Sequence, residues 1–216
     1  MKRLAIIGSG DLGQLIAYHS KTDNHYDVVG FFDDYKSKDE FVDGYSILGN
    51  INDVEDYFQK QLFDYIIIAI GYKHITARKD IYERFKGKIP FGKIIHSSCC
   101  IDISCKIGDG SVLLPGCVLD RNSCVGNNVL LNVSVTIAHD STVKSHSFVS
   151  PCVCIAGFSE VGECCNIGIN STIIDNIIIS DNIQTGGGTL VIDNLVEAGV
   201  YVGVPARLLL HNKQKL

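Results

Sequence analysis

The stretch that decides the fold is Ile101-Asp-Ile-Ser-Cys-Lys-Ile107-Gly-Asp-Gly-Ser-Val-Leu113-Leu-Pro-Gly-Cys-Val-Leu119, in which every sixth residue is aliphatic. Continued in steps of six, the series runs from Ile101 to Val191, and fifteen of its sixteen positions are aliphatic, Thr185 being the exception. An α-helix repeats after about 3.6 residues and a flat strand after about two, so neither produces this period. A period of six is typical of a parallel β-helix, and we predict one from residue 101 to about residue 195.

A second restricted row stands four residues after each aliphatic position and runs from Cys105 to Leu195. Its early members are small and its late members larger, which predicts a second buried row inside a narrow prism. Cysteine fits this row as a small hydrophobic residue, so we interpret Cys105, Cys117 and Cys165 as packing residues. The chain has nine cysteines and no CxxC pair, which argues against a disulfide framework.

Three hexads make one triangular coil of 18 residues, so the repeat predicts about five coils. Each coil pairs only with its neighbours, and the ends of such a stack need caps. We expect the segment from Val204 to Leu210 to form a short carboxy-terminal cap.

Composition narrows the class of protein. The chain has 216 residues, a formal charge of −5, 46% apolar and 20% charged residues, which indicates a folded protein and excludes a basic surface for gripping nucleic acid. It contains no apolar run of the roughly 18 residues that a membrane helix requires. Because the apolar stretch near Met1 is also too short for a secretion signal, we expect a cytoplasmic protein.

Residues 1–95 follow a different pattern. Strands are predicted at 4–7, 28–32 and 65–70, and helices at 14–20, 52–60 and 76–86. Strands that alternate with helices predict a small parallel sheet of Rossmann-like type. We therefore divide the chain into a domain of residues 1–95 and a β-helical domain of residues 96–216.

The first strand leads into Gly8-Ser-Gly-Asp-Leu-Gly13, a glycine turn of the kind that places phosphate at a helix amino end. Two acids, Asp33 and Asp34, follow 20 and 21 residues after Gly13. This spacing is compatible with NAD, but the domain is half of a full doubly wound fold and favours a mononucleotide-sized ligand. Ligands bind beyond the carboxyl ends of such strands, so we expect one crevice bounded by Gly10, Asp11, Leu12, Asp33, Asp34 and Gly71.

His139-Asp140 comes two and three residues after the inward Ile137, so the pair should project from a corner of the prism. It could be an exposed polar pair only. Alternatively, the carboxylate could orient the imidazole and raise its basicity, and histidine titrates near neutral pH, as a general base should. The β-helix contains only one other histidine, His146, so we expect no metal. Cys152 and Cys154 are weaker candidates for a nucleophile.

Motifs over nearly the whole chain carry a family resemblance: Gly8-Ser-Gly-Asp-Leu-Gly13, Phe32-Asp-Asp34, Asn132 with His139-Asp140, Ile155-Ala-Gly157, Ile167-Gly-Ile-Asn-Ser171, Gly186-Gly-Gly188 and Gly203-Val-Pro-Ala-Arg207. The chain resembles the hexapeptide-repeat acyltransferases, and among them the nucleotide-sugar N-acetyltransferases of the bacterial PglD/NeuD type. The resemblance implies a left-handed β-helix that binds acetyl-CoA in a groove between two subunits of a homotrimer. It also implies that residues 1–95 hold a nucleotide-linked amino sugar, with a 4-amino-4,6-dideoxy hexose the first candidate, for surface polysaccharide or O-antigen synthesis.

By position, the resemblance makes His139 the general base and Asp140 its orienting partner. It places Gly157, Ile169 and Gly187 beside acetyl-CoA, with a main-chain N–H near Gly157 as a possible oxyanion donor. Relatives often carry a second coenzyme-binding histidine where this chain has Phe148, so either Phe148 or the nearby His146 would make that contact. Relatives also often have a histidine where this chain has Leu12, which leaves an apolar or main-chain contact there.

Two other functions stay open. Sialic-acid O-acetyltransferases share this architecture and transfer acetyl to a hydroxyl instead of an amine. A β-helix carrying a module that senses NAD or a nucleotide without catalysis is the second alternative.

Overall fold

The computed structural model describes residues 1–209, and a five-stranded sheet forms its amino-terminal part. The elements are β1 (Arg3–Ile7), α1 (Asp11–Thr22), β2 (Asp27–Phe32), β3 (Phe41–Val42), β4 (Tyr45–Gly49), α2 (Val54–Gln59), β5 (Tyr65–Ile68) and α3 (Ile75–Phe85), with short 3-10 turns η1 (Ile51–Asp53) and η2 (Tyr72–His74). The strand order is β3-β4-β2-β1-β5. All pairs are parallel except β3 with β4.

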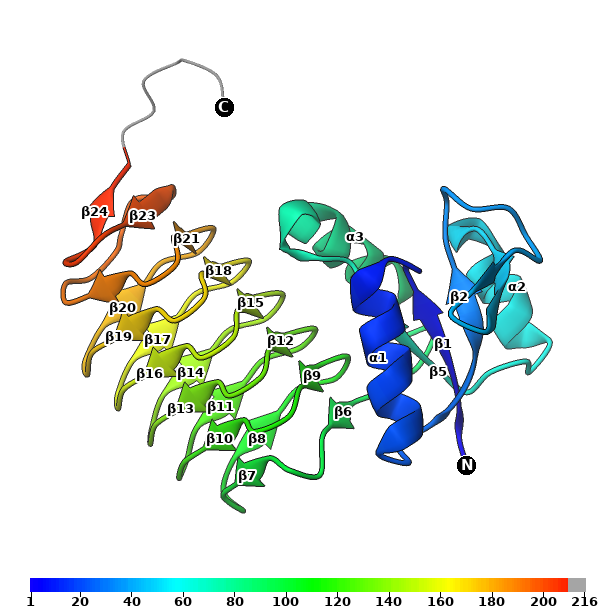
Figure 1. Cartoon of the computed structure of the whole chain (residues 1–216), viewed down its shortest axis with the longest axis horizontal. Coiled ribbons are helices and arrows are strands. Elements are labelled where there is room, and N and C mark those ends of the chain that lie inside the picture. The colour runs from blue at the N-terminus through cyan, green and yellow to red at the C-terminus, as the bar shows by residue number, and fades with distance from the viewer. Residues whose placement is uncertain (210–216) are drawn as a thin grey trace.

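The three predicted strands and three predicted helices are present, with ends shifted by a few residues. The β3–β4 hairpin was not predicted from the sequence. Helix α1 lies on the sheet face that turns toward the β-helix, and α2 and α3 cover the other face (Figure 1). The carboxyl ends of β1, β2 and β5 meet at one edge, where the glycine turn lies.

The β-helix is a triangular prism whose three faces are parallel sheets. The first, here called the β13 face, contains β7 (Cys100–Ile101), β10 (Val118–Leu119), β13 (Thr136–Ile137), β16 (Cys154–Ile155), β19 (Thr172–Ile173) and β22 (Leu190–Val191). The second, the β14 face, contains β8 (Lys106–Ile107), β11 (Cys124–Val125), β14 (Thr142–Val143), β17 (Glu160–Val161) and β20 (Ile178–Ile179).

The third, the β15 face, contains β6 (Ile94–Ile95), β9 (Val112–Leu113), β12 (Leu130–Leu131), β15 (Phe148–Val149), β18 (Asn166–Ile167) and β21 (Gln184–Thr185). It continues into the cap strands β23 (Val200–Val202) and β24 (Arg207–Leu208). The fold class predicted from the sequence, a small parallel-sheet domain followed by a left-handed β-helix with a short cap, is confirmed. Leu210, the last residue of the predicted cap, lies outside the described residues.

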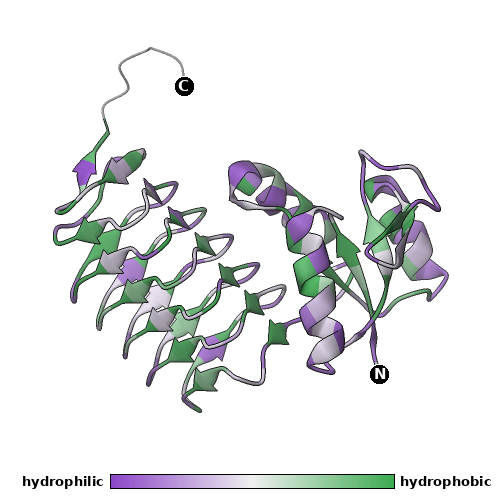
Figure 2. Cartoon of the chain, viewed as in Figure 1, coloured by the Kyte–Doolittle hydropathy of each residue, from purple (hydrophilic) through white to green (hydrophobic). Residues whose placement is uncertain are grey.

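The residues at every sixth position and those of the second row both face the inside of the prism. Strands pair with a register of 18 residues, as in Val118 with Thr136, so equivalent side chains stack in columns. From Leu113 to Val191 the sixth-position residues are buried, and Cys117 and Cys165 are fully buried among them. Thr185 is also buried, and its hydroxyl accepts the Gly168 N–H at 2.8 Å, which explains how a polar residue is tolerated there. Figure 2 shows the hydrophobic strands and the more polar corners.

The amino-terminal domain packs on the β15 face. Ile16, Ala17 and Phe31 belong to the same buried cluster as Val112, Leu130 and Phe148, which face outward from the prism. β6, β9, β12 and β15 are coloured as hydrophobic in Figure 2 where the domain covers them. No helix within residues 1–209 is long and apolar enough to cross a membrane.

Candidate active site

His139 lies in the corner between β13 and β14, and its side chain is 43% exposed. Its Nδ1 is 3.1 Å from Oδ2 of Asp140. A neutral imidazole that donates from Nδ1 to this carboxylate leaves Nε2 unprotonated and able to accept a proton. The arrangement therefore suits a general base.

The Asp140 carboxylate is itself held in place. Asn122 donates from Nδ2 to its Oδ1 at 2.9 Å, and Arg121 lies 3.6 Å from its Oδ2. The hydrogen bond from Asn122, followed by that from His139, holds the pKa of Asp140 below its ordinary value. Asp140 is therefore an anion at neutral pH and can orient the imidazole.

Two residues of the next coil pack against the imidazole. A Cβ atom at Gly157 would lie 2.7 Å from Cε1 and 2.9 Å from Nε2 of His139, so only glycine leaves the ring its place. The Phe158 ring packs edge-on against His139, with centroids 5.0 Å apart. Phe158 is 59% exposed and has a φ of 56°, a left-handed conformation that is rare for a bulky residue.

Sequence reasoning missed Phe158. The signal was present, because the equivalent corner positions one coil apart are Asn122, Asp140 and Asn176, residue types that accept the left-handed conformation. A phenylalanine at such a position is strained, and strain of this kind is often found at functional sites.

The predicted coenzyme residues fall into three groups, of which His146 and Phe148 are described separately below. Gly157 lies with His139, whereas Ile169 and Gly187 share the corner between the β15 and β13 faces. There, Ile169 is 55% exposed, and a Cβ at Gly187 would be 3.1 Å from its Cγ2. The two corners bound opposite edges of the β13 face, so one chain presents them separately. Cys154 projects from that face and Cys152 from the corner of Ile169, and both are exposed.

His146 and Phe148 lie at the contact between the two parts of the chain. His146 is 3% exposed, packs against the Tyr82 ring, and its Nδ1 is 3.1 Å from Nδ2 of Asn128. Burial lowers its pKa. Phe148 is 6% exposed and packs on Tyr72. We therefore assign His146 to this contact rather than to acetyl-CoA, because α3 covers it.

A hollow of about 90 Å³ lies beyond the carboxyl ends of β1, β2 and β5. Of the predicted crevice residues, Asp33 and Asp34 line it, and the glycine turn and Gly71 adjoin it. Gly8 and Phe32, which begin the two motifs quoted from the sequence, also line it. Sequence reasoning did not single out the remaining lining residues, which are Ile7, Tyr35, Ile51, Ile70 and Ile81. They make the hollow mainly apolar, with carboxylates at one side.

Asp33 and Asp34 hold neighbouring segments of this hollow in place through hydrogen bonds. Oδ2 of Asp33 accepts from the Ser9 N–H at 2.8 Å and from the Ser9 hydroxyl at 2.6 Å, and Oδ1 of Asp34 accepts from the Ile51 N–H at 2.8 Å. Burial alone would raise the pKa of Asp33, but hydrogen bonds from Ser9 and Tyr35 outweigh it, and the pKa is lowered. Asp33 therefore stays ionised and fixes the glycine turn.

The start of α1 is open to a ligand. Its first residue is Asp11, its N-cap Gly10 contributes no side-chain hydrogen bond, and a Cβ at Gly10 would meet nothing within 4 Å. Free N–H groups at a helix amino end favour an anion. Leu12 points elsewhere, because it packs against the apolar cluster between the domain and the prism.

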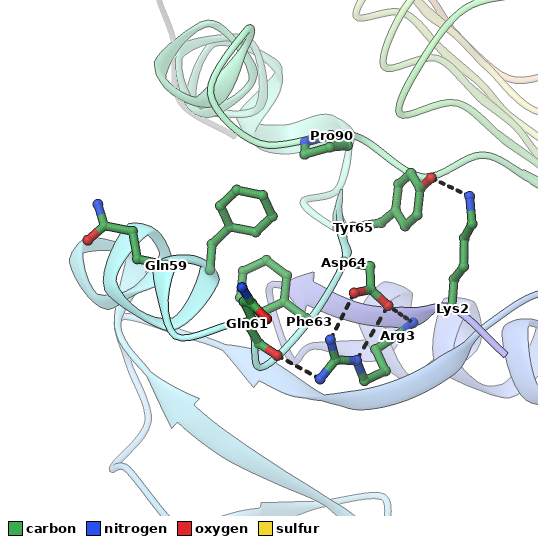
Figure 3. A pocket seen from close by; sticks show the side chains of 9 residues that line it. Lys2, Arg3, Gln59, Gln61, Phe63, Asp64, Tyr65 and Pro90 are labelled. Carbon is green, nitrogen blue, oxygen red and sulfur yellow. Dashed lines mark hydrogen bonds and ion pairs between the residues drawn. The ribbon is translucent and has the colours of Figure 1, made fainter.

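A larger cavity of about 760 Å³ lies at the opposite edge of the sheet (Figure 3). Its charged groups pair with its own walls: Arg3 with Asp64 at 2.8 Å and Lys2 with the Tyr65 hydroxyl at 2.6 Å. Ligands of parallel sheets bind at the carboxyl edge, so this cavity is not the candidate site. In the part of the chain that the structure describes, no group of three or more His, Cys, Asp or Glu is placed to hold a metal ion.

Comparison with known proteins covers the two parts unequally. Residues 3–85 match the family model of the PglD N-terminal domain. A stretch of 62 residues is 39% identical to UDP-3-O-acylglucosamine N-acyltransferase of Bordetella pertussis, which is 29% of this chain and 17% of that protein. The chain thus matches less than a fifth of the length of this curated relative.

Solved structures match over nearly the whole chain. The acetyltransferase domain of PglB from Neisseria gonorrhoeae is 24% identical with a TM-score of 0.88, covering 97% of this chain and 100% of that one. PerB from Caulobacter crescentus, solved with CoA and GDP-perosamine, is 22% identical with a TM-score of 0.86, covering 97% and 98%. These findings confirm the resemblance to PglD-type proteins: the amino-terminal part matches their family model, and the whole chain shares the fold.

Proposed function

We propose that this chain is an N-acetyltransferase that moves acetyl from acetyl-CoA to the amino group of a nucleotide-linked sugar. The observation that carries the proposal is the His139–Asp140 pair at 3.1 Å, exposed at a corner of the prism, with Nε2 free. The solved relatives support it, because one was determined with acetyl-CoA and others with CoA and GDP-perosamine. The glycine turn and open α1 terminus supply a place for the nucleotide phosphates.

The chemistry is direct attack. The neutral amine of the sugar attacks the thioester carbonyl and forms the new C–N bond, while Nε2 of His139 takes a proton from that nitrogen. The resulting imidazolium is stabilised by the Asp140 carboxylate. The C–S bond then breaks and the proton passes to the CoA thiolate, so no acyl-enzyme is needed. Gly157 leaves the imidazole ring its place, and its N–H is our candidate oxyanion donor.

We propose that the complete site is shared between copies in a homotrimer. The candidate crevice belongs to the domain on the β15 face. His139 lies at the corner between the β13 and β14 faces, and in a triangular prism that corner is opposite the β15 face. A sugar held by one chain therefore needs the His139 corner of a neighbour, and Ile169 and Gly187 would form the second wall of a coenzyme groove.

The first test is a substrate panel with acetyl-CoA as donor. UDP-, GDP- and dTDP-linked 4-amino-4,6-dideoxy hexoses are compared with their 4-hydroxy counterparts, and release of the CoA thiol is measured. We expect turnover with at least one amino sugar and none with its hydroxy counterpart. Turnover of the hydroxy sugars alone would make the chain an O-acetyltransferase.

Binding distinguishes the non-catalytic alternative. We expect CoA and one of the three nucleotides each to raise the melting temperature. A response to NAD without a response to CoA would favour a sensing module over an enzyme. We further propose the cytoplasm as its compartment, because a chain whose nine cysteines are all free suits reducing surroundings.

A further inference from the structure

Arg78, in the first half of α3, is a buried cation that the proposed mechanism does not use. Its side chain is fully buried, and within residues 1–209 no carboxylate lies within ion-pair distance of it. Its hydrogen bonds go to main-chain carbonyls: Nη2 donates to Asn128 at 2.9 Å, and Nη1 to Ile70 at 3.2 Å and to Ile68 at 3.3 Å.

These acceptors belong to the two parts of the chain. Ile68 ends β5, and Ile70 lines the candidate nucleotide hollow. Asn128 belongs to the prism, in the corner between β11 and β12. Its Nδ2 in turn donates to the Arg78 carbonyl at 3.3 Å and faces His146 at 3.1 Å. The guanidinium of Arg78 thus connects the rim of the hollow, at Ile70, to the prism, at Asn128.

Stability alone does not explain why an arginine is buried at position 78. Burial lowers the pKa of Arg78 to about 10, which leaves it charged at neutral pH. A buried charge without a counter-ion is unfavourable, and an apolar side chain of similar volume would fill the space more cheaply. The guanidinium does something that packing cannot, since its planar fork holds several carbonyls in one fixed arrangement.

The Ile70 contact fixes a peptide unit. In a trans peptide the C=O and the following N–H point in opposite directions. Because the Ile70 carbonyl points at Arg78, the N–H of Gly71 points away from it. Among the described residues this N–H has no hydrogen-bond partner, and a Cβ at Gly71 would meet nothing within 4 Å. An open donor thus stands at the rim of the hollow.

We propose that Arg78 is the positioning residue of the nucleotide crevice: it holds the Ile70–Gly71 peptide so that the Gly71 N–H meets a phosphate or sugar oxygen, and it locks this rim to the prism at Asn128. The ligand in this statement rests on the proposed function, whereas the locking does not.

Hydrogen exchange tests the locking without a ligand. In Arg78→Lys the charge remains but the fork is lost, and we expect the amides of residues 69–74 to exchange at least about tenfold faster. Strands β18 to β21 should be unchanged. The matched control is Arg84→Lys on the same helix, since Arg84 is exposed, donates to the Asn52 side chain at 3.0 Å and lies over the Phe85 ring. Unchanged exchange at 69–74 in folded Arg78→Lys would overturn the proposal.

Titration tests the ligand side. For UDP, GDP or dTDP, whichever binds the wild type, we expect Kd to rise at least about tenfold in Arg78→Lys while the Kd of CoA changes less than about twofold. Equal losses for both would mean general damage and contradict positioning. If the wild type binds no nucleotide, the proposed function fails, and the exchange result still decides the locking.

A second variant separates the Asn128 carbonyl from its side chain. Asn128 has a φ of 53°, so Asn128→Gly keeps the backbone and the carbonyl acceptor but removes the amide. We expect exchange at 69–74 to stay within about threefold of the wild type. Exchange as fast as in Arg78→Lys would contradict the assigned role of the carbonyl.

Discussion

At the scale of single residues, His139 is held by contacts that come from three successive coils. Asp140 adjoins it in the chain, Asn122 anchors that carboxylate from the coil below, and Gly157 and Phe158 meet the ring from the coil above. An exposed histidine usually samples several rotamers. Here its neighbours restrict the ring and leave one nitrogen available, which is the preorganisation that a general base requires.

Replacing the proposed base, His139, tests this unit. We expect His139→Ala to lower kcat at least about 100-fold with the melting temperature nearly unchanged, because a positioned base contributes about that much and the side chain is exposed. Asp140→Asn keeps the size of the side chain but loses the anion, so a smaller loss is expected. Steady-state kinetics on the best amino sugar measure both. Near-normal turnover in His139→Ala would remove the assigned role.

At the scale of the coil, every sixth residue from Gly110 to Gly188 adopts the left-handed conformation, one at each corner. Asn122, Asn170 and Asn182 do so with a side chain that tolerates it, whereas Phe158 does not. Placing an ordinary side chain there costs about 1–2 kcal/mol. The coil that contains Phe158 is therefore less stable than it would be with asparagine at this position.

Phe158→Asn should separate stability from activity. We expect the free energy of unfolding to rise by up to about 1 kcal/mol, since asparagine relieves the strain and an exposed aromatic ring is removed. Turnover should fall, because the edge contact with His139 is lost. Denaturant unfolding and kcat are measured on the same preparation. A destabilised variant would show that the ring contact outweighs the strain.

At the scale of the whole molecule, the domain and the His139 corner lie on opposite sides of the prism. A mixture of two inactive variants tests whether the site is shared. Gly71→Phe should fill the crevice, because its φ of −73° admits a side chain and the space beside it is open. Co-refolded with His139→Ala, it should recover about a quarter of wild-type activity, the fraction of random interfaces with both intact parts. No recovery from a mixed trimer would place both parts in one chain.

The contact between domain and prism also predicts a pH dependence. Burial, and for His19 the nearby His96, lowers the pKa of His19 and His146 below 6.5. As pH falls below about 6.5 the unfolded chain binds protons that the folded one does not, so stability must decrease, by at most about 1.4 kcal/mol per pH unit for each group. Chemical unfolding from pH 8 to pH 5 measures this.

His146→Gln should flatten that slope, and His74→Gln, which changes an exposed histidine, should leave it as it is. A slope that His146→Gln does not alter would assign the pH dependence to other groups.

The sequence by itself determined the prism, its inward rows and the elements of the sheet. A strict period of six specifies the inside or outside position of every residue, because each coil repeats the one before. The β3–β4 hairpin could not be predicted, because a first strand of two residues is too short to show a periodic pattern. The contact between His139 and Asp140 could be predicted from the sequence because the two residues are adjacent in the chain.

Only the tertiary structure decided what surrounds that pair and where the crevice stands. Phe158 reaches His139 because a coil returns the chain after 18 residues, and Arg78 reaches Asn128 because the domain docks on the β15 face. Docking depends on the complementary shape of two distant surfaces, which no local pattern encodes. For the same reason the sequence left His146 as one of two candidates for the coenzyme contact, whereas in the folded chain α3 packs over it.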